Sequence, residues 1–279
     1  MPLKDLKYKY DQAILKVYGY GEHKKIKIIY LDCLRTAGVE DDEDLNHVER
    51  GTVNDAKLAD NILRTKNKIF ELAFCNPWDY FFTGTLDQTK YDRSDLKTFH
   101  KNLTQFLRDY NKKHDLQIKY LLIPELHEDR VSWHMHGFIY GLPVSHLRQF
   151  KVGDRMGKSL AAKVLNGDTV YNWLDYAAKF GFCDLEPIRD SEAVSRYVTK
   201  YINKNLATSV TELNANQYYH SLGLKMADTI KMGSVTDRVP PTHVSEHCKV
   251  AWLDYDEEKL KELEESFVTI DYYNTRRRK

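Results

Sequence analysis

The sequence predicts an α+β fold, with a central antiparallel sheet of about five strands and helices packed on it. Two apolar, β-rich runs at 118–125 and 133–141 are separated by a short polar segment, a pattern typical of an antiparallel hairpin. Segments 54–74 and 94–112 instead carry apolar residues at helical spacing. The predicted elements follow one another along the chain as strand, helix, strand and strand. This order favours an antiparallel sheet with helices on one face.

Each of these elements has its own signals. The first helix should end at Cys75-Asn76-Pro77, because the residue before a proline avoids the helical conformation. A β-rich strand then covers 80–87, and a last sheet strand is expected at 180–188. The strand at 133–141 should be central, since its neighbours are apolar on both faces.

The flanking regions are harder to interpret. A strand is predicted at 25–31, but nothing else in the first 50 residues points to a role. We therefore expect an N-terminal extension at 1–55, a main domain at 56–210 and a C-terminal extension at 211–279. The last of these ends in the basic run Arg276-Arg277-Arg278-Lys279, which is either a solvated tail or a phosphate contact.

Composition excludes several classes of protein. A net charge of +1 gives no global basic field, so any nucleic-acid site must be local. The four cysteines form no C-x-x-C pair and fit a reducing, cytoplasmic compartment. No apolar run approaches the length of a membrane span, and no membrane partner is expected.

A histidine pair is the first candidate for chemistry. His134 and His136 are two residues apart on a predicted strand, so their side chains project from the same face. Glu125 ends the hairpin partner strand and can lie alongside them. Two imidazoles and a carboxylate suit a divalent cation that also holds a phosphate oxygen. The alternative is a pair of hydrogen-bonded core histidines.

A tyrosine–lysine stripe is the second candidate. It lies on the helix predicted after Asp190 and, by spacings of three and four, comprises Tyr197, Lys200, Tyr201 and Lys204. Tyrosine is a poor nucleophile at its usual pKa near 10, and a metal or a lysine can relieve that difficulty. Attack on DNA would leave a 5′-phosphotyrosine ester that can later be rejoined. The alternative is that the tyrosines only cover the rim of the core.

Three motifs, taken together and in this order, resemble the HUH superfamily of single-strand DNA endonucleases. Phe81-Phe82-Thr83-Gly84-Thr85-Leu86 resembles the first motif, although Gly84 stands where an apolar residue is more usual. His134-Met135-His136 resembles the metal motif, with Gly141 beyond it, and Glu125 stands where related proteins carry an acidic third ligand. Tyr197 to Lys204 resembles the two-tyrosine motif. The likeness covers about 60–210 and is greatest to rolling-circle replication initiators of small phages and plasmids.

The resemblance implies a ferredoxin-like arrangement and a set of roles. His134, His136 and Glu125 would hold Mg²⁺ or Mn²⁺, and Tyr197 and Tyr201 would be the nucleophiles, assisted by Lys200 or Lys204. A single-tyrosine variant, with the other tyrosine structural, stays open. Thr83, Thr85 and Arg196 would contact DNA.

The resemblance also implies a reaction and partners. The protein would nick and rejoin single-stranded DNA at a replication origin, in the cytoplasm of a bacterial cell or a phage-infected host. No helicase motif follows, so a separate helicase and the host replication machinery are expected partners. The alternatives are a related transposase or mobilisation relaxase, a non-catalytic DNA-binding regulator on this scaffold, and a hydrolase of small phosphodiesters.

Overall fold

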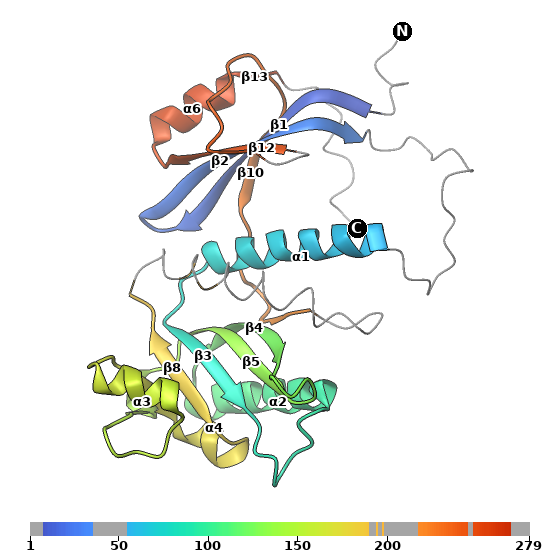
Figure 1. The fold of residues 1–279 in the computed structure, drawn as a ribbon. Coiled ribbons are helices and arrows are strands. Elements are labelled where there is room, and N and C mark those ends of the chain that lie inside the picture. The colour runs from blue at the N-terminus through green and yellow to red at the C-terminus, as the bar shows by residue number, and fades with distance from the viewer. Residues whose placement is uncertain are drawn as a thin grey trace. The chain divides into compact units, whose positions relative to one another are not determined.

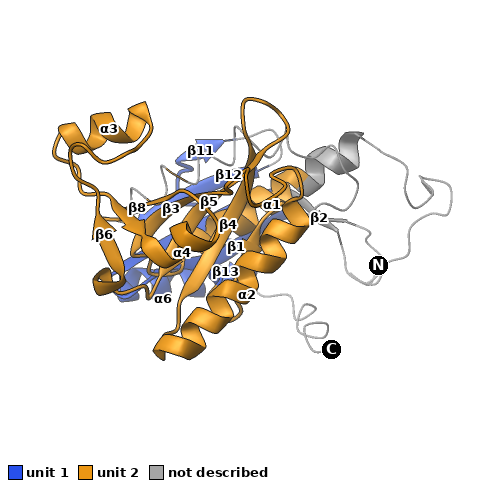
Figure 2. Ribbon diagram, turned by 90° about the horizontal axis from the view of Figure 1, so that it is seen from below, with its two compact units in different colours: residues 1–54, 226–279 blue, residues 55–225 orange. Residues whose placement is uncertain are grey.

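The computed structural model describes residues 8–35, 55–189, 194, 197, 217–244 and 248–268 (Figure 1). The chain divides into two compact units, 55–225 and 1–54 with 226–279 (Figure 2). The predicted α+β class is confirmed. The expectation of one sheet of about five strands is wrong, because the described residues form a seven-stranded sheet and a six-stranded sheet.

The seven-stranded sheet belongs to the unit at 55–225. Its strand order is β6-β7-β8-β3-β5-β4-β9, so the histidine-bearing strand β5 is interior, as predicted. The strands are β3 (Tyr80–Thr85), β4 (Lys119–Leu126), β5 (Trp133–Tyr140), β6 (Leu147–Gln149), β7 (Tyr171–Trp173), β8 (Cys183–Pro187) and β9 (Tyr219–His220). The helices are α1 (Asp55–Phe74), α2 (Leu96–His114), α3 (Lys158–Leu165) and α4 (Leu174–Lys179), with a 3-10 turn at Val144–His146.

Helices cover both faces of this sheet, because alternate residues of its strands are apolar on each side. On one face, α2 and α4 pack over a core that includes Phe82, Met135 and Leu185. On the other face, Ile69, Leu72 and Ala73 of α1 pack against the neighbours of the histidines, namely Phe81, Leu121, Ile123 and Phe138. The sequence predicted helices on one face only, and in this respect the expectation is wrong.

Gly84 of β3 has a steric explanation. A Cβ atom added there would lie 2.5 Å from the Tyr176 hydroxyl oxygen and 2.5 Å from Cζ of Phe82. The space that an apolar side chain would take at this position of the first motif is therefore filled by two aromatic rings. Tyr176 comes from α4 and is fully buried.

The six-stranded sheet joins the two ends of the chain. β1 (Tyr8–Tyr20) and β2 (His23–Arg35) form a hairpin that pairs with β10 (Asp228–Val235) on one side and β12 (Cys248–Asp254) on the other. The short strands β11 (His243–Val244) and β13 (Phe267–Val268) complete it. Leu263 of α6 (Glu257–Glu265) packs with Leu15 and Ile28 in the core of this unit. No helix in the described ranges combines the length and apolar character that a membrane crossing requires.

Candidate active site

Three neighbouring strands bring the three candidate metal ligands and two threonines to one face of the seven-stranded sheet. Thr83 and Thr85 of β3 lie opposite His136 and His134 of β5, respectively. On the other side of β5, Glu125 of β4 lies opposite His134. Because paired residues in a β-ladder point to the same face, these five side chains share one surface.

The two threonine hydroxyls bind the inner ring nitrogens of the histidines. Oγ1 of Thr85 lies 2.8 Å from Nδ1 of His134, and Oγ1 of Thr83 lies 3.3 Å from Nδ1 of His136. A hydroxyl can accept the Nδ1–H proton, which leaves the lone pair of Nε2 available to a metal. The structure thus gives both threonines a contact with a histidine ring, and the expected contact with DNA stays a prediction.

His134 is held in its neutral form. Burial lowers its pKa to about 4, and the nearby His136, His127 and Arg93 lower it further than Glu125 raises it. Nε2 of His134 is buried and has no hydrogen-bond partner within the described part of the chain. A neutral imidazole with a buried, unsatisfied Nε2 is a suitable donor to a divalent cation.

Glu125 reaches diagonally across the ladder to the second histidine. Its Oε2 lies 3.0 Å from Nε2 of His136, and both side chains are less than one-fifth exposed. At this separation the two electron-pair donors need a positive species between them, either a proton or a metal ion. Among the described residues, no three His, Cys, Asp or Glu side chains already surround a single point as metal ligands. A cation held by His134, His136 and Glu125 would therefore have to displace the His136–Glu125 contact.

Tyr197 lies on the same face as the histidines. Its ring stacks on Phe81 with centroids 3.8 Å apart, and the Phe81 ring stands 6.3 Å from the ring of His136. Val194, three residues earlier in the sequence, is buried in the core shared with α1. The predicted residues Arg196, Lys200, Tyr201 and Lys204 lie outside the described residues.

Three further residues approach the site, and sequence reasoning missed them. Asp184 of β8 lies opposite Thr83, and Arg93 and His127 stand close to His134, with the His127 ring stacked at 4.9 Å. Burial and the neighbouring Glu186 raise the pKa of Asp184 to about 6, against the opposing effects of the nearby His136 and Lys163. The expected strand at 180–188 contained Asp184, but only the strand order shows that β8 lies beside β3.

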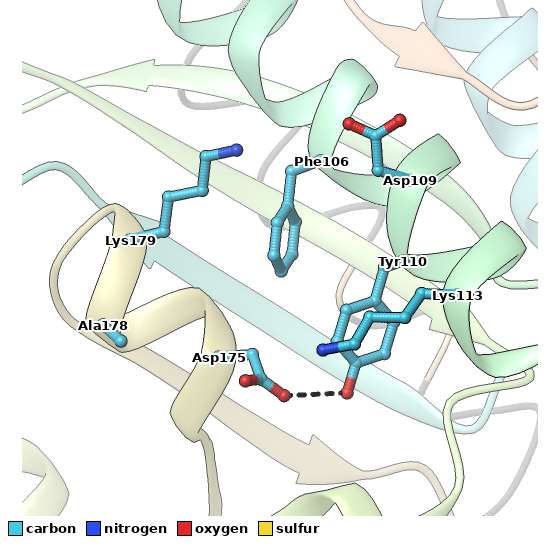
Figure 3. A pocket seen from close by; sticks show the side chains of 7 residues that line it. All are labelled: Phe106, Asp109, Tyr110, Lys113, Asp175, Ala178 and Lys179. Atoms are coloured by element: carbon cyan, nitrogen blue, oxygen red, sulfur yellow. Dashed lines mark hydrogen bonds between the residues drawn. The ribbon is translucent and has the colours of Figure 1, made fainter.

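A recess of about 380 Å³ lies elsewhere on this unit, between α2 and α4 (Figure 3). Phe106 and Tyr110 contribute its aromatic wall, and the Tyr110 hydroxyl donates a hydrogen bond to Asp175 at 3.0 Å. Lys113 and Lys179 stand at its edges (Figure 3). Since α2 and α4 cover the face opposite the histidines, the recess is separate from the candidate site.

Together, the fold and the site form an α+β unit in which an interior strand carries two histidines, the neighbouring strand carries a carboxylate, and Tyr197 lies close by. A comparison of the sequence with models of known protein families is consistent with this site. Residues 79–206 match the family model described as "Replication-associated protein ORF2/G2P". This stretch contains β3, β4, β5 and β8 and the tyrosine segment, so it covers the whole candidate site. The match indicates a protein of DNA replication and is consistent with a rolling-circle replication initiator. No curated protein and no solved structure matches the chain.

Proposed function

We propose that this protein is a rolling-circle replication initiator that nicks and rejoins single-stranded DNA at a specific site through a covalent 5′-phosphotyrosine intermediate. The observation that carries the proposal is the position of Phe81. Its ring stacks on Tyr197 at 3.8 Å and stands 6.3 Å from the ring of His136, so a tyrosine and the histidine face belong to one surface. The replication-associated family match over 79–206 supports the same reading.

The residues present fit a divalent cation, Mg²⁺ or Mn²⁺. Nε2 of His134 is buried and has no partner among the residues that the structure describes, and Nε2 of His136 faces Oε2 of Glu125 at 3.0 Å. His134, His136 and Glu125 would hold the ion, with coordination positions left open for phosphate oxygens. When bound, the ion would polarise the scissile phosphodiester and stabilise the charge that develops on it.

The covalent step would be a transesterification. The phenolate oxygen of Tyr197 forms a bond to phosphorus, the bond from phosphorus to the 3′ oxygen breaks, and the 3′ oxygen leaves as a hydroxyl after taking up a proton. The ester is retained, so attack by a 3′-hydroxyl reverses the step and rejoins the strand. Tyr201 would accept the second strand transfer. Lys200 or Lys204 would favour the phenolate or hold the phosphate, and Arg196 would contact the DNA backbone.

The partners follow from this reaction. The substrate would be single-stranded DNA at a replication origin, unwound by a separate helicase and extended by the host replication machinery. The near-neutral charge of the whole chain means that binding would depend on local cations near the site, such as Arg93.

A covalent adduct is the direct test. The full-length protein is incubated with Mn²⁺ and a pool of single-stranded oligonucleotides that includes rolling-circle origin sequences, then denatured and separated by size. The proposal expects a protein–DNA band that survives denaturation and disappears after protease treatment. Absence of the band with Mn²⁺ and with Mg²⁺ would overturn the nuclease function.

Variants then assign the roles. Tyr197→Phe and Tyr201→Phe are compared singly and together; loss only in the double variant means that both tyrosines are competent nucleophiles. His134→Ala combined with His136→Ala should abolish the adduct. An adduct that persists in this double variant would exclude the metal mechanism.

A further inference from the structure

An aromatic residue lies on the face of the histidines, at the start of β8. Phe182 directly precedes this strand, and its carbonyl oxygen accepts the backbone N–H of Thr85 at 2.8 Å. The next residue, Cys183, is buried in the core under α2 and α4. Because side-chain direction alternates along an extended chain, Phe182 projects from the opposite face, which also carries Asp184 and the candidate metal ligands.

Phe182 is exposed, unlike every other phenylalanine of the chain. Its exposed fraction is 39%, whereas the other members of the set of 11 are buried or half-buried. Phe180, two residues earlier, is fully buried under α2 and α4. Gly181 between them has a φ of +130°, a conformation that favours glycine and breaks the regular alternation. The chain thus turns one phenylalanine inward and leaves the next one in contact with solvent.

The Phe182 ring belongs to the row of the first histidine. Phe182 is bonded to Thr85 of β3, and Thr85 is paired with His134 of β5 and lies 2.8 Å from its Nδ1. Two strand spacings separate Phe182 from His134, which is about 10 Å between their backbones. The sugar and base of one nucleotide can cover this distance when its phosphate lies at the candidate metal site.

The ring is supported from one side. Its centroid lies 6.0 Å from that of Phe150, with an angle of 32° between the two rings. Phe150 is buried in a small core with Leu160 of α3. The guanidinium carbon of Arg148 lies 5.8 Å from the Phe150 ring, and Arg148 donates two hydrogen bonds to Asp154. An exposed ring with such a support loses little conformational freedom when a planar ligand stacks on it.

We propose that Phe182 is a base-stacking residue, on which a nucleobase of single-stranded DNA next to the scissile phosphate lies. The position beside that phosphate rests on the proposed function. Every nucleobase has a π-face, so an aromatic ring binds single strands with little dependence on sequence. A neutral base also suits the surroundings of the ring. The next side chain on this face of β8 is the carboxylate of Asp184, which disfavours a phosphate at the same place.

Binding of oligodeoxythymidylate in EDTA tests the stacking without the nuclease reaction. The probe is a fluorescein-labelled strand of about 20 nucleotides, longer than a usual single-strand site. Phe182→Leu keeps an apolar side chain but removes the π-face, and it should weaken binding about tenfold. Phe182→Trp should bind at least as tightly as the unaltered protein. An affinity of Phe182→Leu equal to that of the unaltered protein would refute the inference.

An abasic strand of the same length separates stacking from contacts with the backbone. It carries phosphates but no bases, so Phe182→Leu and the unaltered protein should bind it equally. In Phe182→Trp, the fluorescence that the substitution adds should be quenched by oligodeoxythymidylate and not by the abasic strand. If Phe182→Leu weakened binding of both strands equally, the ring would support the fold or a phosphate contact, and the proposal would be overturned.

Tyr140→Leu is the matched control on the same face. Tyr140 is 38% exposed and ends β5, about 20 Å along the strand from His134. This variant should keep the affinity for oligodeoxythymidylate. An equal loss in Tyr140→Leu would show that binding follows exposed apolar surface in general. Light scattering examines another occupant of the ring, because a molecular mass that falls in Phe182→Leu would assign Phe182 to a contact between copies of the chain and overturn the proposal.

These outcomes are separate from those of the proposed function. A protein whose affinity for oligodeoxythymidylate depends on Phe182, but which forms no covalent adduct, would retain the stacking residue and lose the nuclease function. A protein that forms the adduct while Phe182→Leu binds oligodeoxythymidylate normally would do the opposite.

Discussion

Nε2 of His136 lies 3.0 Å from Oε2 of Glu125, although the residue directly opposite Glu125 in the β-ladder is His134. A proton must lie between two such acceptors unless a metal replaces it. We therefore expect Mn²⁺ to displace this contact, so that the carboxylate of Glu125 contributes to the affinity for the ion. Calorimetric titration of Mn²⁺ into the unaltered protein and into Glu125→Gln measures this contribution.

Glu125→Gln keeps the shape of the side chain and removes its charge. This variant should bind Mn²⁺ at least about tenfold more weakly, because a carboxylate is a much stronger ligand for a divalent cation than an amide. An unchanged Mn²⁺ affinity in Glu125→Gln would contradict a role for this carboxylate as a ligand.

The Phe81 ring should matter for the covalent step more than for metal binding. Phe81→Leu removes the 3.8 Å stack that positions Tyr197 while keeping an apolar side chain in a buried position. This large-to-small change in the core costs about 1–2 kcal/mol of stability. We expect slower adduct formation at unchanged Mn²⁺ affinity, measured by single-turnover gel assays and calorimetry.

Phe138→Leu is the comparison for this variant. Phe138 lies in the same core and packs edge-on against Phe81 with centroids 5.8 Å apart. The Phe138→Leu variant should lose about as much stability as Phe81→Leu but should form the adduct at the rate of the unaltered protein. Equal slowing in both variants would mean that the rate reports core packing and not the position of Tyr197.

Asp184 should make the protein less stable as the pH rises. Its folded-state pKa of about 6 lies above the ordinary 3.8, so between these values the folded state binds a proton that the unfolded state does not. The stability that Asp184 contributes is therefore fully present below about pH 4 and is lost as the pH rises through about 6. Between pH 4 and pH 7, the free energy of unfolding of Asp184→Asn should rise relative to that of the unaltered protein by on the order of 2 kcal/mol.

Urea unfolding in the presence of EDTA measures this difference. His134 titrates in the same window with the opposite sign, since its lowered pKa removes stability as the pH falls from 6.5 towards about 4. That contribution is common to both proteins and cancels in the comparison. A stability difference that does not change with pH would show that Asp184 is not desolvated as described.

Gly84 should tolerate no side chain. Gly84→Ala would place a Cβ atom 2.5 Å from the Tyr176 hydroxyl, and such overpacking costs about 1–3 kcal/mol. Tyr176→Phe should stabilise the protein by about 1 kcal/mol, because the buried hydroxyl has no partner among the described residues. Combining the two should recover part of the alanine penalty, as measured by urea unfolding.

Gly157→Ala is the control for the alanine substitution. No atom lies within 4 Å of a Cβ at that position, so alanine there should cost only the weaker N-cap preference at the start of α3, about 1 kcal/mol or less. An alanine at 84 that is equally harmless would contradict the packing of Tyr176 beneath β3.

Local patterns predicted the elements around the site well. The apolar runs at 118–125 and 133–141 became β4 and β5, and the helical spacings at 54–74 and 94–112 became α1 and α2. The hairpin also brought Glu125 beside the histidines, because a short loop fixes the register of two antiparallel strands.

Long-range pairing was not predictable in the same way. β1 pairs with β10, more than 200 residues later, as in Gln12 with Ser234. Neither strand carries a local signal for the other, so the second sheet was missed. The position of Asp184 beside Thr83 could not be predicted for the same reason, since it depends on β8 pairing with β3 across about 100 residues.

By itself, the sequence determined which residues could carry chemistry: two histidines at strand spacing, a carboxylate on the hairpin partner and tyrosines at helical spacing. Such spacings specify local geometry, because side-chain direction repeats every two residues in a strand and every three to four in a helix. Only the tertiary structure decided that Thr83 and Thr85 bind the histidine rings, that Phe81 links Tyr197 to His136, and that Asp184 lies behind Thr83. These relationships arise where distant strands and helices pack together, and burial and side-chain contact have no periodic signature along the chain.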